Sequence, residues 1–341
     1  DLSVLAGTCD EDAVMYRGEI VEKGPSLEIL THPKHPHTRA LTDAVPVIGD
    51  QKSRLNPASR KLSDPGETSA VRVVASGSGE EVLGAENLSV QFHTRVGTVK
   101  AVDDVDLSCK EGEITVLVGQ SGSGKTTLVR TVLGLQPPTS GSINFRGQPL
   151  SHKQRDLRDY RGRVQFVLQD PMSALNPKHT VYEAIAEGIR VQGLEGDERQ
   201  RVREALLAAG LTPPERFFAK LPSQLSGGQR QRVVIAGALA LEPEFLIADE
   251  PVASLDASVR GAILALLLRL KHRLGLGCLV ITHGLGVAWN IADRVLVMHR
   301  GKIVESGEAE SVLLRPQHEY TRQLIAAVPT IRDSTTDEVR A

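Results

Sequence analysis

The sequence predicts a layered α/β fold with a phosphate-binding loop, and three observations support this prediction. Residues 114–118, 164–167, 245–248 and 278–282 are short apolar runs of the kind that form buried parallel strands. Stretches with helical periodicity alternate with these runs, as they do in α/β domains. A glycine-rich segment follows the first run and leads into a helical stretch. In such folds ligands bind at the carboxyl ends of the strands.

Composition and charge are those of an ordinary water-soluble protein. About 40% of the 341 residues are apolar, 24% are charged, and the formal net charge of −2 gives no reason to expect a nucleic acid partner. The longest apolar run, 262–270, is far shorter than the ~20 residues that cross a bilayer. Cys9, Cys109 and Cys278 lie far apart without a CxxC pair, which favours a reducing cytosol over a zinc or disulfide site.

The chain contains an internal repeat. A shift of 283 residues aligns 14–46 with 297–329 without a gap, and 17 of the 33 positions are identical, glycines, prolines and a histidine among them. A period this long suits a duplicated domain rather than a solenoid. We expect residues 1–46 to be the C-terminal remnant of a first copy. Residues 47–80, rich in Ser, Pro, Gly and charge, read as a linker.

The second copy is expected to run from 81 to 332, followed by a polar tail at 333–341. Its clearest helical pattern is 258–274, for which Asp256 is available as a start signal. The apolar face of this predicted helix comprises Val259, Ile263, Leu266, Leu267 and Leu270.

Residues 119–127 (GQSGSGKTT) fit the GxxxxGK[ST] pattern between a predicted strand and a predicted helix. Glycines let backbone N–H groups close around phosphate oxygens, and a helix N-terminus adds positive potential. Lys125 is expected to reach the β and γ phosphates and Thr126 to bind Mg²⁺; the alternative is a glycine-rich turn with a chance lysine. The predicted nucleotide-binding residues here are Gly119, Gln120, Ser121, Gly122, Ser123, Gly124, Lys125, Thr126 and Thr127.

The run 245–248 ends in two acids. After a P-loop in the same domain, Asp249 is expected to hold Mg²⁺ and Glu250 to orient or deprotonate the attacking water. An apolar strand that ends in acids is common without such a role, so the P-loop carries this interpretation.

Leu225-Ser226-Gly227-Gly228-Gln229 precedes a helical pattern. Its free N–H groups and hydroxyl could form a second phosphate-binding nest, or Ser226 could be an ordinary N-cap. Because one domain needs one phosphate cradle, a second cradle would serve nucleotide bound to another domain.

The P-loop, LSGGQ and the ADE sequence, in this order and spacing, resemble the ATP-binding cassette (ABC) ATPases. The resemblance implies an α/β P-loop NTPase (RecA-like) core, a helical subdomain at about 150–228 and a small antiparallel β subdomain. It implies ATP and Mg²⁺ as cofactors. It also assigns Gln169 to the Q-loop near Mg²⁺, Ser254-Leu255-Asp256 to the D-loop, His283 to the switch at the γ-phosphate and Phe92 to adenine stacking.

Three segments, QDPMSALNP, LSGGQRQRV and RPQHEYTRQLIAAVP, narrow the resemblance to oligopeptide/dipeptide importers. Gly284, Gly237 and Val252 depart from the usual Asp, Arg and Thr of the family. Many peptide importers of this family end in a cysteine-rich segment, but no cysteine follows Cys278, and this weakens the assignment of peptide as cargo. Under the 283-residue shift Asp1 aligns with Gly284, so the first copy is expected to begin one residue after its switch histidine.

The resemblance implies partners as well. Cassettes of this kind pair head to tail, so a second cassette is expected, either the missing half or another copy of this chain. Transmembrane permease subunits would place the chain at the cytoplasmic face of the cell membrane, with an extracytoplasmic solute-binding protein as an indirect partner. Three alternatives stay open: a soluble ABC component of a multi-protein complex, an inert fragment, and a translation or nucleic-acid ABC protein. A protein of the last kind usually has a long charged helix between its cassettes.

Overall fold

The computed structural model describes residues 9–43, 46–51, 53–55, 79–95, 97–253 and 255–328. Asp1, Ser254 and the tail 333–341, which the sequence analysis singled out, lie outside the described residues. In the described part of the chain, no helix is both long and apolar enough to cross a bilayer.

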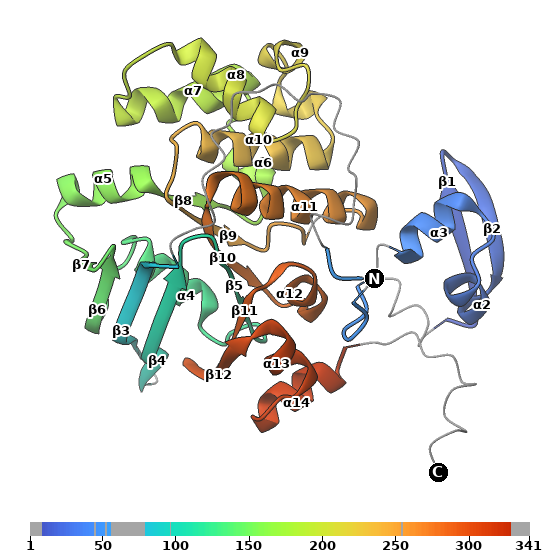
Figure 1. Ribbon diagram of the computed structural model, residues 1–341, viewed down its shortest axis with the longest axis horizontal. Coiled ribbons are helices and arrows are strands. Elements are labelled where there is room, and N and C mark those ends of the chain that lie inside the picture. Colours follow the sequence, from blue (N-terminus) through green and yellow to red (C-terminus); the bar gives the residue numbers. More distant parts are fainter. Residues whose placement is uncertain are drawn as a thin grey trace.

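A six-stranded sheet forms the centre of the fold (Figure 1), with the order β12-β11-β5-β10-β9-β8. Five of its strands run parallel, and β12 at one edge is antiparallel to β11. The four apolar runs predicted as buried parallel strands are β5, β8, β9 and β10, which confirms that prediction. The strands are β5 Ile114–Val118, β8 Val164–Val167, β9 Phe245–Asp249, β10 Gly277–Thr282, β11 Arg294–His299 and β12 Lys302–Glu308.

One face of this sheet packs against helices α10 (Gly227–Leu239), α11 (Ala257–Leu274) and α12 (Leu285–Ile291). The predicted helix at 258–274 is α11, and four of its five predicted face residues are buried, while Val259 is partly buried against the same core. Asp256 precedes α11 as its N-cap residue, although its side chain makes no capping hydrogen bond.

The other face packs against helix α4 (Lys125–Val132) and a second, antiparallel sheet with the order β4-β3-β6-β7. Leu128, Val129 and Val132 of α4 share this core with Leu117 of β5. This second sheet is the small antiparallel β subdomain that the resemblance implied. Its strands are β3 Glu81–Thr94, β4 Gly97–Lys110, β6 Ser140–Phe145 and β7 Gln148–Pro149.

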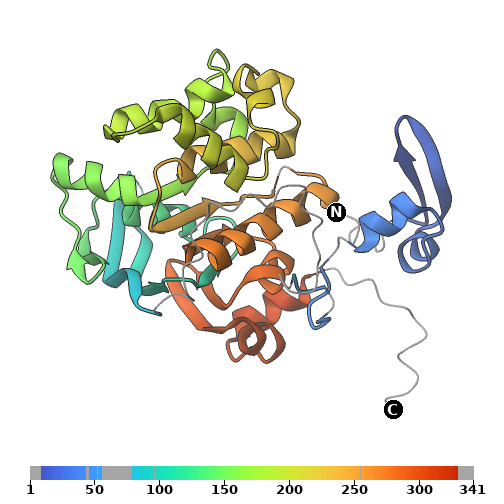
Figure 2. The same ribbon diagram turned by 45° about the horizontal axis from the view of Figure 1, so that its top comes forward.

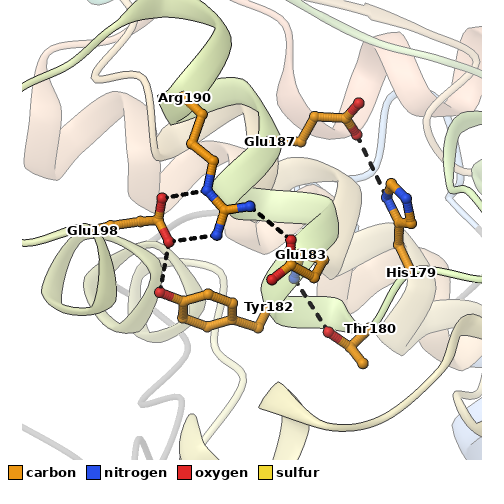
Figure 3. A network of polar contacts seen from close by, with 7 residues as sticks. All are labelled: His179, Thr180, Tyr182, Glu183, Glu187, Arg190 and Glu198. Atoms are coloured by element: carbon orange, nitrogen blue, oxygen red, sulfur yellow. Dashed lines mark hydrogen bonds and ion pairs between the residues drawn. The ribbon is translucent and has the colours of Figure 1, made fainter.

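Between β7 and α10 the chain is mainly helical, as predicted for 150–228, although β8 in this range joins the central sheet. Arg190 of α7 is bound by Glu183 on its own helix and by Glu198 at the start of α8, and Glu198 also accepts a hydrogen bond from Tyr182 (Figure 3). This network ties α7 to α8. The helices are α5 Gln154–Arg163, α6 Pro171–Ala174, α7 Val181–Gln192, α8 Glu198–Ala208 and α9 Glu215–Phe218, followed by the short 3-10 helix η1 Pro222–Gln224.

The first repeat copy, called the repeat unit below, folds into the same elements as the end of the chain. Strands β1 (Glu11–Tyr16) and β2 (Glu19–Pro25) and helices α2 (Ser26–Thr31) and α3 (Pro36–Asp43) correspond to β11, β12, α13 (Ala309–Leu314) and α14 (Glu319–Ala326). Even the register shift between Val14 and Met15 recurs at the equivalent residues of β11. Figures 1 and 2 show the repeat unit to one side of the two sheets. The division of the chain into a cassette remnant, a linker and a full cassette stays a prediction.

Candidate functional site

The glycine-rich loop lies between β5 and α4, at the carboxyl end of a fully buried strand. Gly124 has a φ of 109°, and a Cβ atom there would lie 2.2 Å from the carbonyl oxygen of Ala101 in β4. A Cβ at Gly119 would lie 2.3 Å from the carbonyl oxygen of Met298 in β11. The loop is therefore held between two strands at positions that only glycine can fill.

Lys125 and Ser123 give this loop the properties of an anion cradle. The Lys125 ammonium is buried and donates to the carbonyl oxygens of Gly119 at 2.7 Å and Gln120 at 2.9 Å. Burial lowers the pKa of Lys125, and the nearby acids Glu250 and Asp249 oppose that shift. The buried Ser123 hydroxyl has no hydrogen-bond partner among the described residues. A buried cation and an unsatisfied hydroxyl on a glycine loop fit a phosphate group.

Other residues of the loop and of the first turn of α4 are exposed or partly buried. Ser121, Gly122 and Thr126 are exposed, and Thr127 is partly buried. Thr126 is the second residue of α4, so its hydroxyl lies at the helix N-terminus, where oxygen ligands for a cation bound to phosphate are expected. The residues predicted for nucleotide phosphates therefore lie in one loop and the first turn of one helix.

The end of the chain contacts this loop directly, which the sequence reasoning missed. The Gln120 N–H donates to the Tyr320 hydroxyl at 3.0 Å, and the Gly301 N–H donates to the carbonyl oxygen of Ser123 at 2.8 Å. The His299 ring lies against the Tyr320 ring, with centroids 3.8 Å apart. Tyr320 lies in the RPQHEYTRQLIAAVP segment that resembles oligopeptide/dipeptide importers, but nothing in the sequence predicts that it contacts the P-loop.

Asp249 and Glu250 lie at the end of β9, beside the P-loop edge of the sheet. Burial, followed by the charge of Glu250, raises the pKa of Asp249. Glu250 has a φ of 46° and donates its N–H to the carbonyl oxygen of Ile281 in neighbouring β10. A non-glycine residue in this left-handed region is uncommon, and such residues concentrate at functional sites.

The Glu250 carboxylate and His283 are brought together. One carboxylate oxygen lies 2.6 Å from His283 Nδ1 and accepts the His283 backbone N–H at 2.9 Å. The other oxygen accepts the Thr282 hydroxyl at 3.1 Å. The His283 side chain is 70% exposed, whereas that of Glu250 is 12% exposed. Thr282 was not predicted as a site residue, and its place beside Glu250 follows from the pairing of β9 with β10.

Gln169 and Phe92 lie on elements that border this site. Gln169 is exposed and follows β8, which pairs with β9, so it lies near the carboxyl edge that carries Asp249. Phe92 is 43% exposed and pairs with Val99 in β4, two residues before the Ala101 carbonyl that faces the P-loop. The predicted roles of Gln169 at Mg²⁺ and of Phe92 at adenine stay predictions.

The LSGGQ segment is not brought to the P-loop. Ser226 is the N-cap of α10, where it forms a capping box with Gln229: the Gln229 N–H donates to Ser226 Oγ, and the Ser226 N–H donates to Gln229 Oε1. A Cβ at Gly228 would lie 2.4 Å from a methyl carbon of Val259, which explains that glycine by the packing of α10 on α11. Gly227 is partly buried at the helix start. α10 belongs to the core on one face of the sheet and α4 to the core on the other, so this segment and the chain's own P-loop begin helices on opposite faces.

The structure describes two of the three predicted D-loop residues and all three departures from the family pattern. Leu255 is buried, and Asp256 is exposed at the start of α11. The Gly284 N–H donates to the Thr282 hydroxyl, a Cβ at Gly237 would meet open space, and Val252 is buried. Glu250 keeps its hydrogen bonds with Thr282 and His283 beside these residues.

Comparison with known proteins matches two family models to the chain. The family described as "ABC transporter" matches residues 102–253, and "Oligopeptide/dipeptide transporter, C-terminal region" matches residues 21–70 and 304–341. The second family thus matches both copies of the repeat.

Among curated proteins, the chain is similar to the glutathione import ATP-binding protein GsiA of Escherichia coli (strain K12) and of Shigella sonnei (strain Ss046). Each is 41% identical over 355 residues, which cover 98% of this chain and 56% of the relative. The chain thus spans about half the length of the curated relatives it matches.

Two solved structures support the fold. One is cbiO1 from Clostridium perfringens, part of the ABC transporter complex cbiONQ, with 30% identity, a TM-score of 0.62 and coverage of 73% of this chain and 96% of that chain. The other is a dimeric, post-hydrolysis state of the ATP-binding cassette MJ0796 bound to ADP and Pi, with 29% identity, a TM-score of 0.59 and coverage of 67% and 98%.

Proposed function

The chain belongs to the ATP-binding cassette (ABC) transporter family, and we propose that it binds and hydrolyses ATP to power the import of a peptide-like solute. The observation that carries the hydrolytic part is the pairing of Glu250 with His283 at 2.6 Å, at the same sheet edge as the Lys125 loop. A carboxylate, an imidazole and a buried ammonium around one phosphate-binding loop are the groups that water attack on a phosphoryl group requires.

ATP phosphates would replace the backbone carbonyls that now accept from Lys125. The N–H groups of Ser121, Gly122 and Gly124 and the Ser123 hydroxyl would donate to the same phosphate oxygens. Phe92 would stack on adenine. Thr126, Asp249 and Gln169 would hold Mg²⁺, an ion that prefers oxygen ligands and, when bound, neutralises charge on the phosphates. The fit rests on the unsatisfied Ser123 hydroxyl and on the raised pKa of Asp249, since a nearby cation would favour its ionised form.

Glu250 would act on the attacking water. Its carboxylate is already oriented by Thr282 and by the backbone and ring of His283, so little motion is needed to hold a water in line with the γ-phosphate. The exposed His283 ring can turn from Glu250 toward the γ-phosphate and donate to it, which stabilises charge that develops during bond cleavage.

A second cassette would complete the site. Ser226 and the N-terminal N–H groups of α10 form an anion-binding helix start, and α10 lies on the opposite face of the sheet from α4, which Lys125 begins. Head-to-tail pairing would place Ser226, Gly227, Gly228 and Gln229 of one cassette, with its Asp256, over the nucleotide of the other. ATP would then hold the pair together, and hydrolysis would release it.

The importer part of the proposal rests on the comparisons and on the surface beside Gln169. The chain matches an oligopeptide/dipeptide transporter region twice, and its relative GsiA is named for glutathione import. Leu168 and Met172, on either side of the Q-loop, are 41% and 46% exposed. An apolar surface there suits a helix of a permease subunit at the cytoplasmic face of the membrane. A solute-binding protein outside the cell would be an indirect partner.

The test combines an ATPase assay with co-purification from membranes. We expect Mg²⁺-dependent hydrolysis that Lys125→Ala abolishes by weakening ATP binding, and we expect the tagged chain to co-purify with two polytopic membrane proteins. Arg203→Ala, which breaks only an exposed ion pair with Glu215, is the matched control. Hydrolysis that survives Lys125→Ala would contradict the site. Co-purification with soluble proteins alone would contradict transport and favour a soluble ABC complex.

A further inference from the structure

Part of the segment predicted as linker lies on the surface of the cassette. Residues 46–51 and 53–55, called the strap below, begin at the last residue of the repeat unit and contact α12 and α13, more than 230 residues further along the chain. Ile48 and Leu55 pack against the main core. The strap is also ordered by its own backbone, since the Asp50 N–H donates to Val47 O and the Ser53 N–H to Asp50 O.

Trp289 of α12 is the centre of this contact. Its indole N–H donates to the carbonyl oxygen of Asp50 and to Ser53 Oγ, each at 3.1 Å, and the Arg54 guanidinium lies 5.5 Å from its ring centroid. The Trp289 side chain is fully buried. Without the strap its N–H would lose both acceptors, so the cassette has a polar group that this segment satisfies.

Arg54 fixes the position of the strap along the surface. One guanidinium nitrogen pairs with Glu310 of α13 at 2.6 Å, and the other donates to the carbonyl oxygen of Ala292 at 2.8 Å. The Leu55 N–H donates to the carbonyl oxygen of Asn290 at 3.2 Å. Arg54 therefore joins the end of α12 to the first turn of α13.

At the other end of the strap, Pro46 packs onto Gly286. A Cβ at Gly286 would lie 2.4 Å from Pro46 Cγ, although nothing in the backbone of α12 requires glycine there, since its φ is not positive. The strap thus explains a helical glycine that stands three residues after His283.

Pro46, Ile48 and Asp50 of the strap recur in the second copy as Pro329, Ile331 and Asp333, but the residues at the far end of the strap differ between the copies. At the 283-residue offset, the tail has Asp337 in place of Arg54 and Glu338 in place of Leu55. The sequence at the receiving positions differs as well, because Ala6 aligns with Trp289 and Leu27 with Glu310. An Asp beside Glu310 would repel it, and an alanine side chain has no N–H donor to satisfy. At these positions the chemistry matches the strap to the cassette and does not match the tail to it.

We propose that the strap is a specific docking segment by which the cassette binds the end of the repeat unit, and that this recognition runs in one direction, from the first copy to the second. The cassette surface at Trp289, Gly286 and Glu310 is its receptor. Docking holds the repeat unit beside the helix that follows His283. The proposal does not depend on ATP hydrolysis or transport.

Trp289 reports on docking, because it is the chain's one tryptophan. In the full chain, Arg54→Glu places two carboxylates together, and we expect a red-shifted Trp289 emission and faster quenching by acrylamide. Arg54→Glu combined with Glu310→Arg restores the opposite charges and is expected to return the emission toward that of the wild type. Arg322→Glu, which breaks the exposed pair with Glu319 on α14, is the control and is expected to change nothing. An unchanged emission in Arg54→Glu would overturn the proposal.

A second test turns on the sign of a stability change. Alanine in place of a helical glycine normally raises the melting temperature, and Gly261→Ala in α11, where a Cβ meets open space, is expected to do so. Gly286→Ala is expected to lower the melting temperature and to shift Trp289 emission to the red, because its methyl group displaces Pro46. If Gly286→Ala raises the melting temperature as Gly261→Ala does, the strap is not docked.

The specificity has its own experiment. Residues 47–55 are replaced by the equivalent tail sequence, TIRDSTTDE from 330–338, in an otherwise unchanged chain. We expect the emission of this variant to match that of Arg54→Glu. Emission like that of the wild type would show that either copy's segment docks, and would overturn one-directional recognition.

Discussion

Replacing Glu250 by Gln tests the catalytic assignment with little disturbance of the fold. The amide oxygen can keep the contacts with the His283 N–H and ring, and the amide nitrogen can donate to the Thr282 hydroxyl, which lies 3.1 Å from the present carboxylate oxygen. Glutamine is the same size as glutamate, and the side chain is only 12% exposed. We therefore expect a melting temperature close to that of the wild type.

The effect on hydrolysis is expected to be large. Glutamine cannot take a proton from water at neutral pH, and a positioned general base contributes about 10²- to 10⁴-fold to a rate. That factor corresponds to roughly 3–5 kcal/mol of barrier, at about 1.4 kcal/mol for each tenfold change. ATP affinity should be unchanged, because the Lys125 ammonium donates to the carbonyl oxygens of Gly119 and Gln120 and not to Glu250.

The assay measures phosphate release at saturating ATP and, separately, equilibrium binding of a fluorescent ATP analogue. Glu215→Gln is the matched control, since it makes the same chemical change at an exposed ion pair with Arg203. Hydrolysis by Glu250→Gln within a factor of about three of the wild-type rate would refute the reasoning. Loss of analogue binding would show instead that Glu250 acts on nucleotide affinity.

Three further outcomes are expected. Asp249→Asn should raise the melting temperature of the nucleotide-free protein at pH 8: the raised pKa of Asp249 means that its charged form costs stability above that pKa, and the gain should vanish below the ordinary value of 3.8. A lower melting temperature at pH 8 would contradict this. Tyr320→Phe removes the acceptor of a P-loop N–H and should raise KM for ATP roughly 2- to 10-fold with little change in kcat, as for one lost hydrogen bond; an unchanged KM would show that the contact is idle. Of the three cysteines, only exposed Cys9 should react quickly with a thiol reagent, because Cys109 and Cys278 are buried with pKa values raised to about 12; more than one fast thiol in the native protein would contradict the packing.

The local features of this fold could be predicted from the sequence. The strands β5, β8, β9 and β10 and the helix α11 each have a burial pattern that short-range periodicity records. The glycines of the P-loop and the acids after β9 stand within a few residues of the strands that position them. The repeat was visible because identical residues at a constant offset need no structural knowledge to be detected.

Contacts between distant segments were decided by the tertiary structure alone. Glu250 and His283 lie 33 residues apart in the chain and meet because β9 and β10 are neighbours in the sheet, an order that periodicity does not encode. Tyr320 reaches the P-loop, 200 residues earlier, because β11 lies beside β5. Arg54 lies in a segment predicted as a linker because that segment is rich in Ser, Pro, Gly and charge, yet Arg54 pairs with Glu310, 256 residues away. Sequence patterns report which face of a segment is buried; which segment covers that face depends on packing, and packing exists only in the folded chain.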